Sequence, residues 1–196
     1  MFITYRLKFT LPSKIMEEFA RRRQEWLKEW ENALPEDKQA AKVREAGLRF
    51  AWFDELLDKS FEVPGFLQSQ EITDIIATAF QHFNGLRYRL IAYCVMPNHV
   101  HALILPLQDA EGNSFSPARI IYGWKRYTAN RINRSLGRTG SLWQKESYDH
   151  VVRDEKEMIN VTEYIIQNPV RAGLVKNWEE WPGTWIAEDL RPECVL

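Results

Sequence analysis

The chain has 196 residues, a length that fits one domain with a sizeable core, and its net charge at pH 7 is −1. Hydrophobic residues make up 45% and charged residues 27%, proportions that exclude a disordered chain. No apolar run approaches the roughly 18 to 20 residues that cross a bilayer, so no membrane partner is expected. The first residues, MFITYRLKFTLPSK, lack the long apolar core of a signal peptide, which predicts a cytoplasmic protein. Cys94 and Cys194 lie far apart, which suggests neither a disulfide scaffold nor a C-x-x-C zinc motif.

Positive charge is concentrated in one segment, although the chain as a whole is nearly neutral. Between Glu111 and Glu146 there is no acidic residue, and the segment carries +7, so the rest of the chain sums to −8. A solvated helix face ordinarily mixes both signs, so a local footprint for a polyanion is the better interpretation. The basic residues of the segment are Arg119, Lys125, Arg126, Arg131, Arg134, Arg138 and Lys145.

The first third of the chain predicts one strand followed by a helical insertion. Residues 2–10 alternate like a β-strand with one buried face. Residues 13–59 are charged and rich in tryptophan, with apolar residues at helical intervals, and Pro35 is expected to separate two helices. The whole insertion is expected to span about 13–66.

The rest of the chain predicts further helices and strands. Ser69 is a plausible cap for the first of these helices, and a Met-Pro-Asn turn joins two strands into an antiparallel hairpin. Pro169 is expected to stop the last helix. The expected elements are a helix at 69–83, strands at 86–95 and 100–106, a helix from Pro117 to about Leu136, a short strand at 147–152, a helix from Asp154, and an aromatic, loop-like tail at 176–196.

This order of elements predicts an α+β fold in which an antiparallel sheet carries its helices on one face. A single domain is expected over 1–176, with the helical insertion inside it and a C-terminal tail at 177–196. Such a fold hosts many functions, so the function has to be inferred from the site.

Two of the four histidines, His99 and His101, follow a Pro-Asn turn at the start of an apolar strand. Side chains two residues apart on a strand point to the same face, with Cα atoms about 6.6 Å apart. Both imidazoles can therefore reach one divalent ion while Val100 points into the core. Taken alone, this motif fits a structural or surface pair of histidines equally well.

The last helix adds Tyr164 and Asn168, which are four residues apart and so share a helix face. A tyrosine hydroxyl is a possible nucleophile for phosphoryl transfer, and an amide oxygen is an acceptable ligand for a hard metal ion. A helix tyrosine is ordinarily a packing residue. Its coincidence with the two histidines and a basic helix favours the catalytic interpretation.

Four runs of the sequence carry a resemblance to a known family. The run YCVMPNHVHALILP is followed by GWKRYTANRINRSLGRTGSLWQ, ESYDHVVRDE and EYIIQNPVRAGLV. In this order and spacing the runs resemble the REP-associated tyrosine transposases, which belong to the HUH superfamily of single-tyrosine transposases. The resemblance is dense over residues 86–176, and the insertion at 13–59 departs from the family pattern.

The resemblance implies a ferredoxin- or RRM-like HUH fold and a role for each matching residue. His99 and His101 match the metal-binding pair, and Tyr164 matches the nucleophile on the last helix. Asn168 matches a third ligand position, where related single-tyrosine transposases have Gln. The implied activity is metal-dependent nicking and joining of single-stranded DNA through a 5′-phosphotyrosine, with hairpin-forming repeat DNA as the expected substrate.

The expected cofactor is a divalent ion, Mg²⁺ or Mn²⁺, and the expected partner is single-stranded or hairpin DNA. No nucleotide cofactor is expected, because the sequence lacks a G-x-x-x-x-G-K-[ST] loop. A monomer and a homodimer both stay open. So do three other interpretations: an inactive nucleic-acid-binding module, a metal-dependent hydrolase that uses water, and a site formed by His150 with Tyr148.

Overall fold

The computed structural model describes residues 1–8 and 65–191 without a gap, and also residues 17, 18, 21, 22, 24, 25, 28, 31, 32 and 57. The chain divides into two compact units. The first unit consists of Met1–Lys8 and Pro64–Leu196, and the second of Phe9–Val63. The first unit carries the sheet and all the residues of the predicted site.

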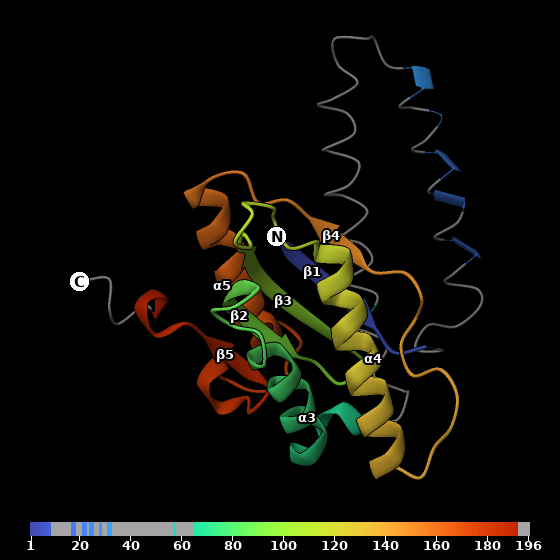
Figure 1. Cartoon of the computed structure of the whole chain (residues 1–196). Helices are drawn as coiled ribbons and strands as arrows, with labels where there is room; N and C mark the ends of the chain where they lie inside the picture. The colour runs from blue at the N-terminus through green and yellow to red at the C-terminus, as the bar shows by residue number, and fades with distance from the viewer. Residues whose placement is uncertain are drawn as a thin grey trace. The chain divides into compact units, whose positions relative to one another are not determined.

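The sheet of the first unit has five strands in the order β4-β1-β3-β2-β5, and its strand pairs are antiparallel (Figure 1). This arrangement confirms the predicted α+β class and the predicted hairpin, which is formed by the second and third strands. The strands are β1 (Phe2–Arg6), β2 (Tyr88–Val95), β3 (His99–Pro106), β4 (Tyr148–His150) and β5 (Thr184–Ile186).

One face of the sheet is covered by α3 (Gln70–Gln81) and α4 (Pro117–Ser135), which lie side by side in Figure 1. Alternate residues of β1 point to opposite faces of the sheet. Tyr5 points toward α3 and α4, and its ring packs against the Trp143 ring with centroids 4.8 Å apart. On α4, the Trp124 ring packs against Phe80 of α3 at 4.6 Å. These contacts place the main hydrophobic core between the sheet and the two helices.

The opposite face of the sheet is covered by α5 (Glu155–Arg171). Phe2, which points away from Tyr5's side of β1, packs edge-on against Tyr164 of α5 with ring centroids 6.0 Å apart. The helices, expected on one face, are therefore divided between the two faces, and both faces of β1 are buried. Helical periodicity identifies an apolar stripe, but it does not tell which face of a sheet the stripe covers.

The start of α5 matches the prediction, but its end does not. The Asp154 side chain caps the helix by accepting a hydrogen bond from the Glu157 backbone N–H at 2.8 Å. Pro169, expected to stop the helix, lies inside it, and α5 continues to Arg171. A proline inside a helix removes one N–H donor and crowds the carbonyl four residues earlier, which can kink a helix without ending it.

The segment expected to be a loop-like tail contributes β5 to the sheet. Ile186 and Trp185 lie opposite Ala92 and Tyr93 of β2, and the Trp185 and Tyr93 rings stack with centroids 5.8 Å apart. A strand of three residues is too short to show a periodic pattern, which is why the sequence did not predict it. Residues 192–196 lie outside the described residues.

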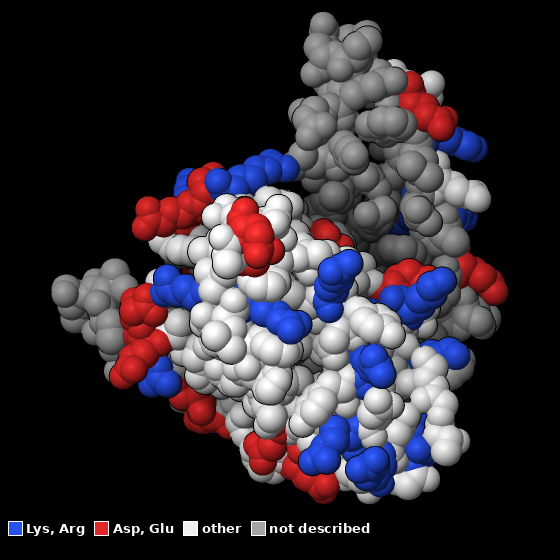
Figure 2. Space-filling view, in the orientation of Figure 1, with Lys and Arg blue, Asp and Glu red and all other residues white. Residues whose placement is uncertain are grey.

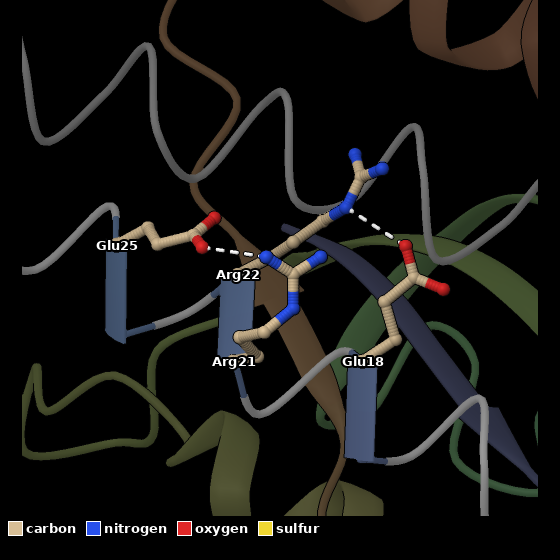
Figure 3. Close-up of polar contacts among 4 residues, drawn as sticks. All are labelled: Glu18, Arg21, Arg22 and Glu25. Atoms are coloured by element: carbon tan, nitrogen blue, oxygen red, sulfur yellow. Dashed lines mark hydrogen bonds and ion pairs between the residues drawn. The ribbon is translucent and has the colours of Figure 1, made fainter.

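The described residues of the second unit are helical, but most of the predicted insertion, including Pro35, lies outside them. Two ion pairs lie along this helical stretch and join side chains four residues apart (Figure 3). Arg21 is 2.7 Å from Glu25, and Arg22 is 3.2 Å from Glu18. Pairs at this spacing stabilise a helix by a few tenths of a kcal/mol each.

Within the described residues, no helix combines the length and the apolar character needed to span a membrane.

Candidate active site

The two histidines of β3 lie side by side on the face of the sheet that α5 covers. His99 and His101 are fully buried, and their Nε2 atoms are 2.8 Å apart. Two ligands of one divalent ion, each about 2.1 Å from it, lie about 3 Å apart when they are adjacent in its coordination shell. The spacing of the two Nε2 atoms therefore fits two ligands of one ion.

The other nitrogen of each ring contacts a neighbouring polar side chain. His99 Nδ1 is 2.6 Å from the Asn98 Oδ1, which accepts only, so Nδ1 carries the proton and Nε2 presents its lone pair. His101 Nδ1 is 2.7 Å from the Thr4 hydroxyl on β1. Hydrogen bonds of this kind fix the tautomer and the ring orientation of metal-binding histidines.

Both imidazoles are held in the neutral form that metal binding requires. Burial lowers the pKa of His99 to about 3. Burial also lowers the pKa of His101 well below its usual value, and the neighbouring His99 and Arg171 act in the same direction. A neutral imidazole keeps a lone pair for a metal, whereas an imidazolium has none to offer.

Helix α5 places Tyr164 and Asn168 next to this pair. The Tyr164 ring is 5.8 Å from the His101 ring between centroids and is half-buried. The Asn168 side chain is buried, with its Nδ2 3.2 Å from His101 Nε2. We call the group His99, His101, Tyr164 and Asn168 the His–Tyr site.

The donors of the His–Tyr site fit a divalent ion if the amide of Asn168 turns its oxygen toward His101. A half-turn of an amide exchanges oxygen and nitrogen with little change in shape. Among the described residues, no cluster of three His, Cys, Asp or Glu side chains offers an alternative metal site. Two imidazoles with one amide oxygen are an acceptable set of ligands for Mn²⁺ or Mg²⁺.

Arg171 is a neighbour of the site that the sequence did not single out. Its guanidinium carbon lies 4.7 Å from the centre of the Tyr164 ring, and the side chain is exposed to solvent. Both residues line a shallow pocket of about 420 Å³ on α5. The signal was present in the sequence, because Arg171 is seven residues after Tyr164 and so lies on the same helix face.

Five of the seven predicted DNA-binding residues lie on α4, which covers the other face of the sheet. Six of the seven are exposed, and Figure 2 shows several Lys and Arg side chains over α4. Arg138 also packs its guanidinium 5.1 Å from the Phe66 ring centre. The structure therefore does not bring the residues of α4 to the His–Tyr site. The exposed residues are Arg119, Arg126, Arg131, Arg134, Arg138 and Lys145.

Lys125 differs from the other six because its ammonium group points into the protein. Nζ donates to the backbone carbonyls of Gln144, Lys145 and Glu146 at 3.0, 3.2 and 3.1 Å. Burial lowers its pKa to about 8, against an opposing effect of Glu146. These three bonds use the three N–H donors that Lys125 has, so its observed role is to anchor the 144–146 segment to α4.

The alternative pair, His150 and Tyr148, lies on the edge strand β4. His150 Nε2 is 2.7 Å from the Glu157 carboxylate, and the Tyr148 ring packs on Phe2 at 6.5 Å. The His150 imidazole is thus paired with an acid of α5. The two buried imidazoles that face each other are those of His99 and His101.

Residues 66–168 match the family model described as "Transposase IS200 like", and the chain belongs to this family. This match confirms the family resemblance seen in the sequence. A putative REP-associated tyrosine transposase of Haemophilus influenzae is 29% identical over 114 residues, 54% of this chain and 63% of that protein. A REP-associated tyrosine transposase of Escherichia coli is 28% identical over 104 residues, 53% of this chain and 57% of that protein. The chain thus matches less than two thirds of the length of these relatives.

The fold is also that of a solved REP-associated tyrosine transposase bound to a REP hairpin. The two structures share a TM-score of 0.56 at 16% sequence identity, and the alignment covers 100% of this chain and 81% of the other. At this identity the likeness supports the fold alone.

Proposed function

We propose that this protein is a metal-dependent enzyme that nicks and rejoins single-stranded DNA, and that hairpin-forming repeat DNA is its substrate. One observation carries the proposal: β3 and α5, far apart in the sequence, place two neutral imidazoles beside a tyrosine and an amide. Membership in the IS200-like transposase family supports it. Two relatives named as REP-associated tyrosine transposases support the choice of substrate.

In the proposed reaction, DNA binding exposes the Tyr164 hydroxyl, which is buried in the structure. Its oxygen attacks a phosphorus atom of single-stranded DNA and loses its proton to solvent. The bond from phosphorus to the 3′ oxygen breaks, and that oxygen takes up a proton and leaves as a 3′ hydroxyl. The 5′ phosphate stays linked to Tyr164. Rejoining is the reverse reaction with another 3′ hydroxyl, and it needs no nucleotide hydrolysis because the phosphotyrosine conserves the ester bond.

The residues of the His–Tyr site and its neighbours have different roles in this reaction. His99, His101 and Asn168 would hold the divalent ion. When bound, this ion supplies Lewis-acid polarisation of the scissile phosphate. Thr4 and Asn98 keep the two imidazoles in the orientation that presents Nε2.

Arg171 would bind the scissile phosphate. Its guanidinium lies over the Tyr164 ring, and among the described residues it makes no ion pair with a carboxylate. A guanidinium is a strong donor for phosphate oxygens, and stacking on an aromatic ring holds it in place without using its N–H groups. The positive charge is therefore available beside Tyr164, the residue that attacks the phosphate in the proposed reaction.

Arg171→Gln should reduce the rate of cleavage about 100-fold, the usual loss when one donor to a developing negative charge is removed. Cleavage rates at saturating hairpin DNA, with Arg171→Lys as the charge-conserving control, measure this effect. A substrate with a methylphosphonate at the scissile position should be affected much less, because its charge is already absent. An equal loss on both substrates would argue against a phosphate contact.

The exposed arginines of α4 would bind the DNA backbone away from the His–Tyr site. Replacing Arg126, Arg131 and Arg134 by Gln should weaken single-strand binding for all sequences. With a slope of roughly 0.7 per phosphate contact, losing three contacts should lower the log–log salt dependence by about 2. Fluorescence anisotropy at several salt concentrations measures this slope, and thermal unfolding first checks that the variant is folded.

A control with the same charge change outside α4 separates local contacts from net charge. Arg153, Lys176 and Arg191 are exposed and lie outside the basic segment. Replacing these three by Gln should leave the salt slope nearly unchanged. Equal slopes for both triple variants would show that α4 does not carry the contacts.

The proposed function itself is tested by incubating the protein with Mn²⁺ and hairpin DNA that has a single-stranded flank, followed by denaturing gels. A DNA–protein band that survives denaturation, together with a new 3′ hydroxyl end, is the expected result. A pure binding module would give neither product. A hydrolase that uses water would give the cut end without the covalent band.

A further inference from the structure

A glycine stands in the middle of α4 without a structural reason in the protein itself. Gly123 is exposed and is the seventh of the 19 residues of the helix. A Cβ added there would meet no atom within 4 Å. Glycine destabilises a helix interior relative to alanine, so the missing side chain has a cost that no close packing explains. The packing of the protein therefore does not explain why residue 123 has no side chain.

That space is part of a pocket of about 310 Å³ between α3 and α4. Several aromatic side chains line it: Phe83 follows α3, and Trp124 and Tyr127 come from α4. Trp124 is only 3% exposed and forms a fixed wall, whereas Tyr127 is 42% exposed and borders the opening. A flat aromatic group can stack on such walls, and the absent Gly123 side chain leaves it room.

The charged side chains that line the pocket are basic, and no carboxylate is among them. Arg87 and Arg119 both line it and are exposed, and the Arg87 guanidinium stacks 3.7 Å from the Phe83 ring centre. Arg126 and Tyr122, which is 65% exposed, continue the same kind of surface along α4. Figure 2 shows several basic side chains over this helix. The basic side chains are complementary to an anion, and the aromatic side chains are complementary to a flat aromatic group on the same ligand.

We propose that this pocket binds one unpaired base of the DNA substrate, with its flanking phosphates at Arg87 and Arg119. A nucleotide has the required combination of a flat π-face and a negative charge, and bases stack on aromatic side chains in single-strand binding proteins. The proposal rests on the proposed function for the identity of the ligand. It goes beyond that function because the pocket lies on the face of the sheet opposite the His–Tyr site.

The position of the pocket defines its role as anchoring and separates it from the chemistry. Tyr5 and Phe2 point to opposite faces of β1, toward α4 and α5 respectively. A base held near Gly123 is therefore kept away from Tyr164 by the sheet. Filling the pocket should weaken DNA binding without changing the rate of adduct formation at saturating DNA.

Gly123→Leu is the variant that tests this proposal. Leucine is a better helix former than glycine, and the Cβ that it adds meets no atom within 4 Å, so the unfolding temperature should stay the same or rise. Its side chain would occupy the space assigned to the base. Asn130→Leu is the matched control, since residue 130 is exposed and lies seven positions along the same helix face without lining the pocket.

Binding is measured by anisotropy with hairpin DNA that has a single-stranded flank, in the Tyr164→Phe background, so that no turnover occurs. Each unpaired nucleotide of the probe is replaced in turn by an abasic site. Removing the base at one of these positions should lower the affinity about 10-fold, which is within the range for loss of one stacked base. In Gly123→Leu the intact probe should bind about 10-fold more weakly, and the abasic site should cost nothing further. Asn130→Leu should behave like its parent.

Three results would overturn the assignment of the pocket: unchanged affinity in folded Gly123→Leu, no sensitive position in the abasic series, or a position effect that persists in Gly123→Leu. Because binding is measured without cleavage, these results do not depend on the chemistry of Tyr164. Failure of the wild type to form a covalent adduct would instead contradict the proposed function and leave a base-specific binding result intact.

Discussion

Tyr164→Phe is expected to abolish the covalent DNA–protein adduct while preserving the fold and DNA binding. The substitution removes only the hydroxyl oxygen, which in the proposed reaction forms the new bond to phosphorus. The phenylalanine ring keeps the edge-on contacts with Phe2 and His101, at 6.0 and 5.8 Å in the wild type. Denaturing gels with Mn²⁺ and hairpin DNA should show no adduct band, and anisotropy should show an affinity within about twofold of the wild type.

Tyr148→Phe is the matched control for this experiment. Tyr148 packs against the same Phe2 ring, at 6.5 Å, but lies on the edge strand β4. Its loss should leave the adduct in place. An adduct that persists in Tyr164→Phe and disappears in Tyr148→Phe would assign the nucleophile to β4.

The second large effect is expected from His99→Ala combined with His101→Ala. One remaining amide at Asn168 cannot hold a weakly chelated hard ion, so metal binding and cleavage should be lost together. A Lewis-acid contribution of several kcal/mol corresponds to a rate loss of at least about a thousandfold. Isothermal titration with Mn²⁺ measures the affinity, and gels measure the cleavage.

Both histidines are fully buried, so the double variant must first be shown to be folded by circular dichroism and thermal unfolding. His82→Ala serves as the control for metal binding, because His82 is exposed and lies on the other side of the sheet from the imidazole pair. Its Mn²⁺ affinity should equal that of the wild type. Unchanged affinity in the folded double variant would exclude the His99–His101 pair as the metal site.

Most of the fold could be predicted from local sequence patterns. The helices near 69–83 and 117–136 and the hairpin around the Met-Pro-Asn turn were predicted because each is long and clearly periodic. The position of α5 across the sheet was not, since no local pattern reports which face a helix covers. β5 was missed because its three residues depend on pairing with β2, which is a tertiary contact.

The candidate site was predictable where residue spacing limits geometry, and unpredictable where it does not. Side chains two residues apart on a strand, or four apart on a helix, lie on the same face. The sequence therefore predicted that His99 lies beside His101 and that Tyr164 lies beside Asn168. The approach of the two pairs to each other was inferred only through family resemblance. The inward direction of the Lys125 side chain and the open space at Gly123 depend on tertiary packing, so residue spacing in the sequence could not predict them.

Tandem mass spectrometry of the trypsin-digested covalent adduct tests most directly whether Tyr164 is the nucleophile. Cleavage after Lys156 and Arg171 releases a peptide whose only tyrosine is Tyr164. The nucleotide mass is expected on this tyrosine and should be absent from Tyr164→Phe. Attachment in the peptide that follows Lys145, which contains Tyr148, or the absence of any adduct with a cleaved DNA strand, would contradict this expectation.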